Sequence, residues 1–372
     1  MIDYDVIIVG AGPAGIGVAS LLSQSDLNHL ILDKSEIGNS FLDWPKNMEM
    51  ITPSFPSNAF GQMDLNSIFE STSPAFAFNK EHLTGDEYAI YLSGVADYRA
   101  LNVEKNNEVK KVNEEENSWV VETKKGTYSC KYLIWAAGEF QNPKIENISG
   151  KEHCIHSSLI KTPEELKEDN FVVIGGYESG IQMAFDLVQN NKKATVINPE
   201  VIDDMETSDP SRVLSPYTYT KYDTLKNSDL YTEIIGEAET VSKTENGYQV
   251  QLKDDILIET ESKPICATGF SLVKKPIEHL ITNREDGFPK LNEKTDEFFG
   301  KKNLYLTGPS VRHDEHIFCF IYKFRQRFGV IVEDILLKEE YKKENVSVLV
   351  DGWKRNGMYL SDLSCCGEEC VC

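Results

Sequence analysis

The same glycine-rich pattern occurs twice in this chain, each time between a short apolar run and an amphipathic run. The first copy, over residues 3–24, contains Gly10, Gly12 and Gly15 in the spacing G-x-G-x-x-G. This pattern predicts a strand, a tight turn and a helix whose N-terminus can bind a pyrophosphate. The next apolar run ends in Asp33, where such a unit places an acid for ribose hydroxyls. The first copy therefore predicts a dinucleotide-binding unit.

The second copy begins at Phe171 and departs from the motif at one position. Tyr177 stands where the middle glycine belongs, and that glycine normally permits the closest approach of the backbone to phosphate. We expect a second dinucleotide to bind loosely or in a shifted pose, with a site kept only for structure as the alternative. The following apolar run ends at Asn198, so neither an acid for NADH nor an arginine for NADPH is clear there. Three glycines keep the rest of the motif: Gly175, Gly176 and Gly180.

The two halves of the chain also match beyond the glycine turns. Residues 117–140 and 246–270 each predict a strand, a turn and a second strand, which lead into Ala137–Gly138 and Thr268–Gly269. Residues 302–311 predict one more strand and a glycine turn, followed by a helix of about 25 residues. Because this strand has no room for a domain of its own, we expect it to join the first sheet.

The predicted fold class is α/β, with two Rossmann-like three-layer dinucleotide-binding domains that each carry an antiparallel β excursion. The length of 372 residues exceeds what one core supports, because single cores stop growing at roughly 250 to 300 residues. We place the first domain at residues 1–152 and 300–345, and the second at residues 153–299. Residues 346–372 form a Cys-rich C-terminal tail, in which residues 346–350 predict a short strand.

The chain is strongly acidic, with a formal net charge of -22. Such a charge repels phosphate backbones and anionic lipids, so we expect no nucleic acid and no membrane among the partners. No apolar run in the sequence approaches the roughly 18 residues that a membrane helix needs. The first residues lead into an apolar run without a basic stretch, so we expect no signal peptide and a cytoplasmic location.

Half of the eight cysteines lie in the last eight residues, at Cys365, Cys366, Cys370 and Cys372. Three interpretations stay open: a redox relay, a metal clip, and a surface tail with incidental thiols. A vicinal disulfide between Cys365 and Cys366 would be strained and easily reduced, which favours the relay. Thiolates also bind zinc, copper(I) and softer metals, although a four-thiolate site normally uses two separated pairs. We predict the relay and assign no metal site.

The length of the tail bears on what its thiols can reach. The 27 residues from 346 to 372 span at most roughly 90 Å when extended, enough for this chain's own site or that of a partner subunit. The other four cysteines occur singly among apolar neighbours and are expected to be reduced core residues. They are Cys130, Cys154, Cys266 and Cys319.

The two fingerprints, with "WAAG" before the second and "CATGF" after it, resemble the flavoproteins with two dinucleotide-binding domains. These include thioredoxin reductases, bacillithiol disulfide reductases and flavin-containing monooxygenases, and the resemblance covers residues 3–335. It implies that the first fingerprint binds FAD and the second NADPH or NADH, which passes hydride to the flavin. It also implies a homodimer.

The resemblance implies site residues for both cofactors. The segment 38–57 is similar to bacterial monooxygenase-related flavoproteins and implies that Ser40, Phe41, Trp44, Met50 and Thr52 line the isoalloxazine, with ordinary core packing as the alternative. The remaining implied FAD residues are Gly10, Gly12, Pro13, Ala14, Gly15, Asp33, Lys34, Val109, Ala137, Gly138, Gly308 and Pro309. The implied nicotinamide-nucleotide residues are Gly175, Gly176, Tyr177, Glu178, Ser179, Gly180, Asn198, Thr268 and Gly269.

Departures from these families leave the reaction open. Thioredoxin reductases carry a C-x-x-C beside the flavin, and no such pair precedes residue 365 here. Bacillithiol disulfide reductases carry a cysteine inside the first glycine turn, where this chain has Ala14. The monooxygenase motif between the fingerprints is only approximated, with Ile148 for its Phe and His156 displaced. The letters "LSCCG" are similar to the C-terminal vicinal cysteines of mercuric reductase, which implies a dithiol delivered to the flavin.

Two further features follow the last glycine turn. His313 or His316 could move protons at the flavin, because imidazole titrates near neutral pH, and we assign this role to His316. Residues 322–328, "YKFRQRF", predict a solvated helix face with aromatic side chains inward, or else a cationic pocket for a substrate anion.

The leading function hypothesis is an FAD-dependent NAD(P)H oxidoreductase that passes electrons to a small-molecule or protein disulfide or thiol acceptor through the C-terminal cysteines. A flavin monooxygenase and a non-catalytic soft-metal-binding or redox-sensing flavoprotein are the alternatives.

Overall fold

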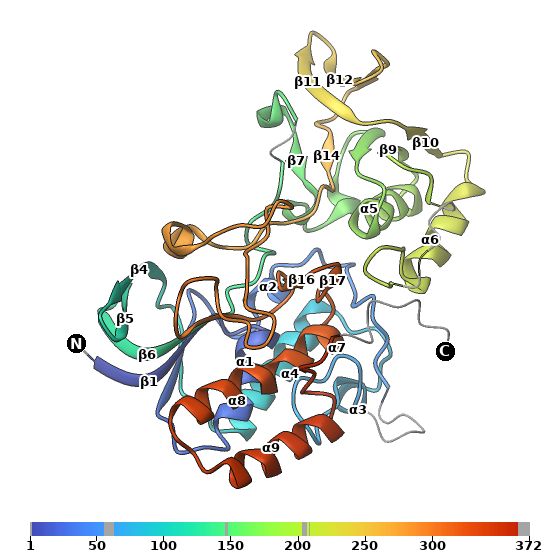
Figure 1. The fold of residues 1–372 in the computed structure, drawn as a ribbon. Helices are drawn as coiled ribbons and strands as arrows, with labels where there is room; N and C mark the ends of the chain where they lie inside the picture. Colours follow the sequence, from blue (N-terminus) through green and yellow to red (C-terminus); the bar gives the residue numbers. More distant parts are fainter. Residues whose placement is uncertain (1, 56–62, 146–147, 203–206, 208, 364–372) are drawn as a thin grey trace. The chain divides into compact units, whose positions relative to one another are not determined.

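The computed structural model describes residues 2–55, 63–145, 148–202, 207 and 209–363 (Figure 1). The chain forms two compact units. The first unit consists of Met1–Leu42, Thr52–Glu139 and Leu272–Cys372, and the second of Asp43–Ile51 and Phe140–Ser271.

The sheet of the first unit has seven strands in the order β3-β2-β1-β6-β5-β4, with β15 also paired to β6. β6 is long enough to pair with two different strands along the same edge. Its first half pairs antiparallel with β5, and its second half pairs parallel with β15. The prediction that the last strand returns to the first sheet is therefore confirmed. The strands are β1 (Ile2–Val9), β2 (His29–Leu32), β3 (Val103–Glu104), β4 (Val109–Glu115), β5 (Ser118–Thr123), β6 (Thr127–Trp135) and β15 (Leu304–Leu306).

Helices of the first unit pack closely on one another. α1 meets α8 where a side chain on Gly17 would lie 2.1 Å from the ring of Phe328, so the glycine permits the contact. α9 packs on α8 and lies beside it in Figure 1. The helices are α1 (Pro13–Leu22), α2 (Asn39–Leu42), α3 (Pro74–Phe78), α4 (Gly85–Tyr98), α7 (Ile321–Phe324), α8 (Phe328–Lys338) and α9 (Lys343–Arg355), with 3-10 turns η5 (Lys275–Leu280) and η6 (Arg325–Arg327).

Two expectations for the C-terminal part are wrong. The single helix of about 25 residues after the last glycine turn is replaced by a hairpin, β16 (Arg312–His313) and β17 (His316–Ile317), and then by α7, η6 and α8. The short strand expected at residues 346–350 is part of α9. Val346, Val350 and Trp353 are buried there, which is the spacing of one helix face.

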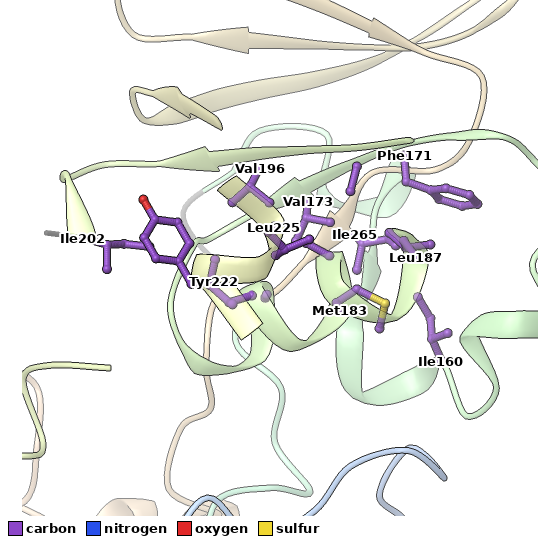
Figure 2. Packing of buried hydrophobic residues seen from close by; sticks show 14 of the residues in the cluster. Ile160, Phe171, Val173, Met183, Leu187, Val196, Ile202, Tyr222, Leu225 and Ile265 are labelled. Atoms are coloured by element: carbon purple, nitrogen blue, oxygen red, sulfur yellow. The ribbon is translucent and has the colours of Figure 1, made fainter. Parts of the chain in front are cut away.

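The second unit is a three-layer structure. Its parallel sheet has the order β10-β9-β8-β14-β7, and the antiparallel sheet β11-β12-β13 covers one face of it. Helices cover the other face, where Val173, Val196 and Ile265 of the sheet meet Met183, Leu187 and Leu225 (Figure 2). The strands are β7 (Ile155–His156), β8 (Asn170–Ile174), β9 (Lys193–Asn198), β10 (Tyr231–Ile235), β11 (Ala238–Thr244), β12 (Gly247–Leu252), β13 (Leu257–Thr260) and β14 (Ile265–Cys266); the helices are α5 (Glu178–Gln189) and α6 (Pro216–Lys226), with η1 (Lys151–His153), η2 (Ser157–Leu159) and η3 (Pro163–Glu165).

The predicted α/β class, with two parallel sheets that each carry an antiparallel excursion, is confirmed. The units are divided at 139/140 and 271/272, with Asp43–Ile51 also in the second unit, whereas the predicted domain limits are 152/153 and 299/300. Residues 140–152 join the second unit because Lys144 donates to Gly269 and Ser149 bridges to Thr240. Residues 272–299 join the first unit, where Trp135 Nε1 donates to Val273 O at 2.7 Å. Which cofactor each unit binds stays a prediction.

None of the described helices is both long enough and apolar enough to cross a membrane.

Candidate functional site

The first fingerprint forms a backbone cradle at the N-terminus of α1. Gly10 has a φ of +111°, and a side chain there would lie 2.3 Å from the carbonyl oxygen of Ala136 on the neighbouring strand. Gly15 packs on Gly10, so that a Cβ would lie 1.8 Å from the Gly10 oxygen. Gly12 caps the helix and faces open space, because a Cβ there meets no described atom within 4 Å. The two outer glycines hold the turn, and the middle one leaves room for a ligand.

Asp33, which follows β2, completes the cradle. Its Oδ2 accepts a hydrogen bond from the Ala11 nitrogen at 2.7 Å, and its Oδ1 accepts one from the Ser35 nitrogen at 2.8 Å. Burial raises the pKa of this carboxyl, and the two backbone hydrogen bonds lower it in part. The carboxylate is thus fixed beside the glycine turn, with lone pairs left for ribose hydroxyls.

The carboxyl ends of β6 and β15 meet beside the same turn. A Cβ atom on Gly308 would lie 3.3 Å from Cβ of Ala14, so Gly308 lies close in space to the first fingerprint. Thr307, next to it, is 2% exposed, and its Oγ1 has no hydrogen-bond partner among the described residues. Gly138, at the end of β6, has a φ of +66°. An unsatisfied buried hydroxyl beside an open glycine cradle fits a bound dinucleotide.

A polar group that the sequence did not single out lies at these strand ends. Ser310 Oγ donates to Glu139 Oε2 at 3.2 Å, and the Arg312 guanidinium attracts the same carboxylate. Burial raises the pKa of Glu139, and burial lowers the pKa of Arg312. Glu139 directly follows the predicted Ala137–Gly138 turn, and this adjacency is the one signal that could have identified it. A carboxyl with a raised pKa can act as a proton donor.

The residues expected around the isoalloxazine fall in both units. Ser40 and Phe41 lie on α2 of the first unit, where the Phe41 ring is 4.7 Å from that of Tyr88. Thr52 is buried, and its carbonyl accepts from Asn66 Nδ2 at 2.7 Å. Two of the set belong to the second unit: Trp44 and Met50. Their role at the flavin stays a prediction. The other predicted residues Pro13, Lys34, Val109, Ala137 and Pro309 all lie in the first unit.

The second fingerprint repeats the cradle at the N-terminus of α5. Gly175 has a φ of +103°, and its Cβ position is 2.5 Å from the Ala267 oxygen. Gly180 packs on the Gly175 oxygen as Gly15 does on that of Gly10. Gly176 lies against Asn198, because a Cβ there would be 2.7 Å from Asn198 Cγ. The predicted glycines and Asn198 are therefore brought together.

Tyr177 and Glu178 tie the start of α5 to the segment before α6. The Tyr177 hydroxyl donates to the Val213 oxygen. Glu178 accepts from the Ser215 nitrogen at 2.5 Å, from Ser215 Oγ at 3.1 Å and from the Thr218 hydroxyl. Burial raises the pKa of Glu178, and these hydrogen bonds lower it in part. Tyr177 has an extended backbone, with φ −98°, so a side chain is tolerated where the motif has glycine. The neighbouring Ser179 lies within α5.

The loop after β14 is held by side chains from elsewhere in the second unit. His156 is buried, with Nε2 3.0 Å from the Gly269 oxygen and Nδ1 2.9 Å from Ser158 Oγ. Burial lowers the pKa of His156. The Thr268 hydroxyl donates to the Lys144 oxygen. His156, displaced from the monooxygenase pattern, thus positions Gly269 through its backbone.

The two histidines after the last glycine turn are adjacent in the β16–β17 hairpin, where His313 pairs with His316. His313 is 2% exposed, with its Nε2 2.5 Å from Asp296 Oδ1, so it is part of the core. His316 is half-buried, and its catalytic role stays a prediction.

The expectation of a solvated face over residues 322–328 is wrong, because Arg325 and Arg327 are 4% and 0% exposed. Arg325 donates to the carbonyl oxygens of Asp64 and Ser67. Arg327 pairs with Asp296 through Nε and Nη2, both at 2.9 Å. Both guanidinium groups thus bind groups of the fold, and the alternative of a cationic pocket for a substrate anion stays a prediction.

Cys154 and Cys266 are brought together, although the sequence shows them as single residues. β14 pairs with β7 so that Ile265 faces Ile155, which places Cys154 and Cys266 on the opposite face of the sheet. A hydrogen bond from the Cys266 thiol lowers the pKa of Cys154, against its burial. Cys266 is fully buried, and its own pKa is raised.

The predicted catalytic cysteines Cys365, Cys366, Cys370 and Cys372 lie outside the described residues. Within the described ranges, no three His, Cys, Asp or Glu side chains are grouped as a metal site would require.

Comparison with known proteins finds a family model, relatives by sequence and solved structures that are similar to this chain. The family model described as "Pyridine nucleotide-disulphide oxidoreductase" matches residues 7–308. The uncharacterized oxidoreductase CzcO of Bacillus velezensis is 33% identical over 190 residues, which are 50% of this chain and 52% of that protein. The match thus spans about half the length of CzcO.

Two further relatives are matched over almost their whole length. Bacilliredoxin reductase Bdr of Bacillus subtilis is 23% identical over 351 residues, 92% of this chain and 100% of that protein. The solved structure of bacillithiol disulfide reductase Bdr (YpdA) from Staphylococcus aureus has a TM-score of 0.74 at 20% identity, and covers 91% of this chain and 100% of that one. This structural likeness shows the same fold.

Proposed function

Because the chain belongs to the pyridine nucleotide-disulphide oxidoreductase family, we propose that it is an FAD-dependent NAD(P)H oxidoreductase that reduces a disulfide through its C-terminal cysteines. Membership of this family implies FAD and NAD(P)H as cofactors. The overall reaction balances as NAD(P)H + H⁺ + RSSR giving NAD(P)⁺ + 2 RSH. When bound, FAD accepts a hydride equivalent from the nicotinamide and passes on an electron pair.

The residues of the first unit are suited to hold FAD. The backbone turn at Gly10–Gly12 and the N-terminus of α1 would bind its pyrophosphate, and Asp33 would bind its ribose hydroxyls. Thr307 supplies a buried hydroxyl at the end of β15. We assign to Glu139 the proton that must be delivered when the disulfide is reduced, because its raised pKa favours the protonated form.

The observation that carries the proposal is the anchoring of the chain just before its cysteines. The Leu360 nitrogen donates to the Gln326 oxygen at 2.8 Å, and Arg327 Nη1 donates to the Leu360 oxygen at 2.5 Å. Phe328, the next residue, packs on Gly17 in the second turn of α1. The segment that leads into the tail is therefore fixed beside the helix whose N-terminus forms the first cradle.

This anchoring shortens the reach that the sequence suggested. Residues 346–360 are taken up by α9 and by the segment that Gln326 and Arg327 bind at Leu360. Cys365 and Cys366 follow Leu360 by five and six residues, a span of at most roughly 20 Å. Such a short span from the anchored residue favours delivery of the thiols to this chain's own flavin.

The acceptor we propose is a low-molecular-weight disulfide or the disulfide of a small redox protein. The relatives named bacilliredoxin reductase and bacillithiol disulfide reductase suggest an acceptor of the bacillithiol or bacilliredoxin type. Bacillithiol disulfide reductases carry a cysteine inside the first glycine turn, where this chain has Ala14. The tail thiols would take its place.

Thiol titration before and after anaerobic addition of NAD(P)H tests the relay. The oxidised full chain should gain two thiols on reduction, whereas a chain that ends at Leu363 should gain none. The variant with Cys365→Ser and Cys366→Ser should lose disulfide reduction and keep flavin reduction. The variant with Cys370→Ser and Cys372→Ser is the matched control within the same tail. Unchanged disulfide reduction by the first variant would rule out the relay.

A flavin monooxygenase is the second candidate, favoured by Ala14 and by the absence of a C-x-x-C before residue 365. Its reaction needs no thiol, and truncation of the tail would leave it intact. Substrate-dependent oxygen uptake that survives deletion of residues 364–372 would support this function. Oxygen uptake at the background rate, together with disulfide reduction by the full chain, would support the reductase.

A further inference from the structure

Asn198 lies at the end of β9, the position at which a Rossmann unit distinguishes NADH from NADPH. This residue closes β9, is 5% exposed, and packs against Gly176 of the second cradle. Rossmann units place at this position an acid that binds the ribose 2'-hydroxyl of NADH, or have an arginine nearby for the 2'-phosphate of NADPH. The sequence alone did not decide between the two, because an amide fits neither pattern.

Glu233, on the neighbouring strand β10, determines how the Asn198 amide is turned. Oε1 of Glu233 accepts from Asn198 Nδ2 at 3.5 Å, and Oε2 accepts from the Tyr222 hydroxyl at 2.8 Å. A carboxylate only accepts hydrogen bonds, so the amide nitrogen of Asn198 faces Glu233 and its oxygen faces away. That oxygen can accept from a hydroxyl, whereas it would repel a phosphate.

The segment after β9 has the wrong charge for a 2'-phosphate. Residues 199–215 contain five acidic residues and a single basic one, Arg212. Arg212 Nε lies 3.8 Å from Asp209 Oδ2, so its charge is shared with a carboxylate. A phosphate monoester carries close to two negative charges at neutral pH and would be repelled by the Glu233 carboxylate beside Asn198.

We propose that this chain uses NADH rather than NADPH, with Asn198 binding the ribose 2'-hydroxyl and Glu233 positioning its amide. The inference rests on the proposed function, in which the second unit binds the nicotinamide cofactor. It names the donor, which neither fingerprint nor family membership decides.

Isothermal titration of the FAD-loaded full chain with NAD⁺ and NADP⁺ measures the preference without turnover. Wild type should bind NAD⁺ at least tenfold more tightly than NADP⁺. Glu233→Gln removes the negative charge and lets the Asn198 amide present either its nitrogen or its oxygen to the ribose. The preference for NAD⁺ over NADP⁺ should therefore fall at least threefold, mainly because NADP⁺ binds more tightly. Glu237→Gln is the matched control, because this exposed carboxylate of the second unit pairs with Lys253.

Equal or tighter binding of NADP⁺ by wild type would overturn the inference, and this comparison needs no variant to fold. Loss of binding of both nucleotides would overturn it as well. If the preference for NAD⁺ over NADP⁺ falls equally in Glu237→Gln, the change is not specific to Glu233, and the role assigned to Glu233 is overturned. Anaerobic mixing with NADH is measured separately. Tight NAD⁺ binding without flavin reduction would contradict the proposed function and support the inference.

Discussion

Arg327 Nη1 donates a hydrogen bond to the carbonyl oxygen of Leu360 at 2.5 Å, thirty-three residues further along the chain. The same guanidinium forms a fully buried bidentate pair with Asp296. One side chain thus joins the ion pair of the core to the last segment before the cysteine tail.

Replacing Arg327 should therefore affect both stability and the tail. Arg327→Met leaves the Asp296 carboxylate buried without this partner, which should lower the free energy of unfolding by about 3 to 5 kcal/mol. It also removes one of the two hydrogen bonds that hold Leu360, so limited proteolysis should cut near residue 360 before the rest of the chain unfolds. Arg355→Met is the control, because that arginine lies at the exposed end of α9. Equal cleavage of both variants would contradict the anchoring role.

The glycines of the first fingerprint separate ligand binding from folding. A methyl group on Gly12 meets no described atom within 4 Å, whereas one on Gly15 would lie 1.8 Å from a backbone oxygen. Gly12→Ala should leave the melting temperature of the flavin-free protein within about 2 °C and reduce FAD content several-fold. Gly15→Ala should destabilise the flavin-free protein itself. Full FAD occupancy in folded Gly12→Ala, measured by absorbance, would argue against the cradle.

The elements that sequence predicts well are those fixed by local pattern. The two glycine turns and Asp33 after β2 are found as expected because they follow from spacing, and β15 returns to the first sheet as expected because it has no room for a domain of its own. The helix α9 was missed because Val346, Val348 and Val350 alternate as in a strand. Val348 is 70% exposed while Trp353 packs on Gly329 of α8, so tertiary packing overrides local preference.

The polar groups could not be predicted because their partners are distant in sequence. Glu139 meets Ser310 only because β6 and β15 are parallel neighbours. The sequence places Arg327 on a solvated helix face, whereas in the structure it is buried because it pairs with Asp296. Charged side chains are buried only when such partners are present, and a local sequence pattern does not show which distant residues these are.

Cys154 should be the most readily alkylated thiol of the second unit. The hydrogen bond from the Cys266 thiol lowers the pKa of Cys154, so its thiolate forms at lower pH than that of an ordinary cysteine. Cys266→Ala removes that bond, and the pH midpoint of labelling at Cys154 should rise. Cys266→Ser, which keeps a donor, should move it less. Bromobimane labelling resolved by peptide mass spectrometry checks this, with the buried Cys130 as the unlabelled control. An unmoved midpoint in Cys266→Ala would contradict the pairing.

Glu139 should impose a pH limit on disulfide reduction. Because its pKa is raised, the proton is held to higher pH than on an ordinary glutamate, and the rate should fall as pH rises through that pKa. A raised pKa means that the folded state favours the protonated carboxyl, so ionisation of Glu139 lowers the free energy of unfolding. Glu139→Gln should therefore be more stable than wild type above that pKa. The variant should also be several-fold slower, with the falling limb of its pH profile gone. A uniform loss of rate with an unchanged profile would make Glu139 structural.

Tyr177 decides how closely a nucleotide can approach the second cradle. Tyr177→Gly restores the fingerprint and leaves an accepted N-cap residue on α5, so little stability should be lost from the helix. With the side chain gone, the affinity for nicotinamide dinucleotide should rise roughly three- to tenfold, because the backbone can meet the phosphates directly. Isothermal titration of the two FAD-loaded proteins gives the comparison.

Tyr177→Phe separates the ring from its hydroxyl. It removes the hydrogen bond to the Val213 oxygen, which ties the segment before α6 to the start of α5. Affinity should stay within about twofold of wild type in this variant, while proteolysis between residues 209 and 215 should become faster. If the glycine variant instead binds the nucleotide more weakly and the phenylalanine variant is unchanged, the tyrosine ring is a nucleotide contact rather than an obstacle.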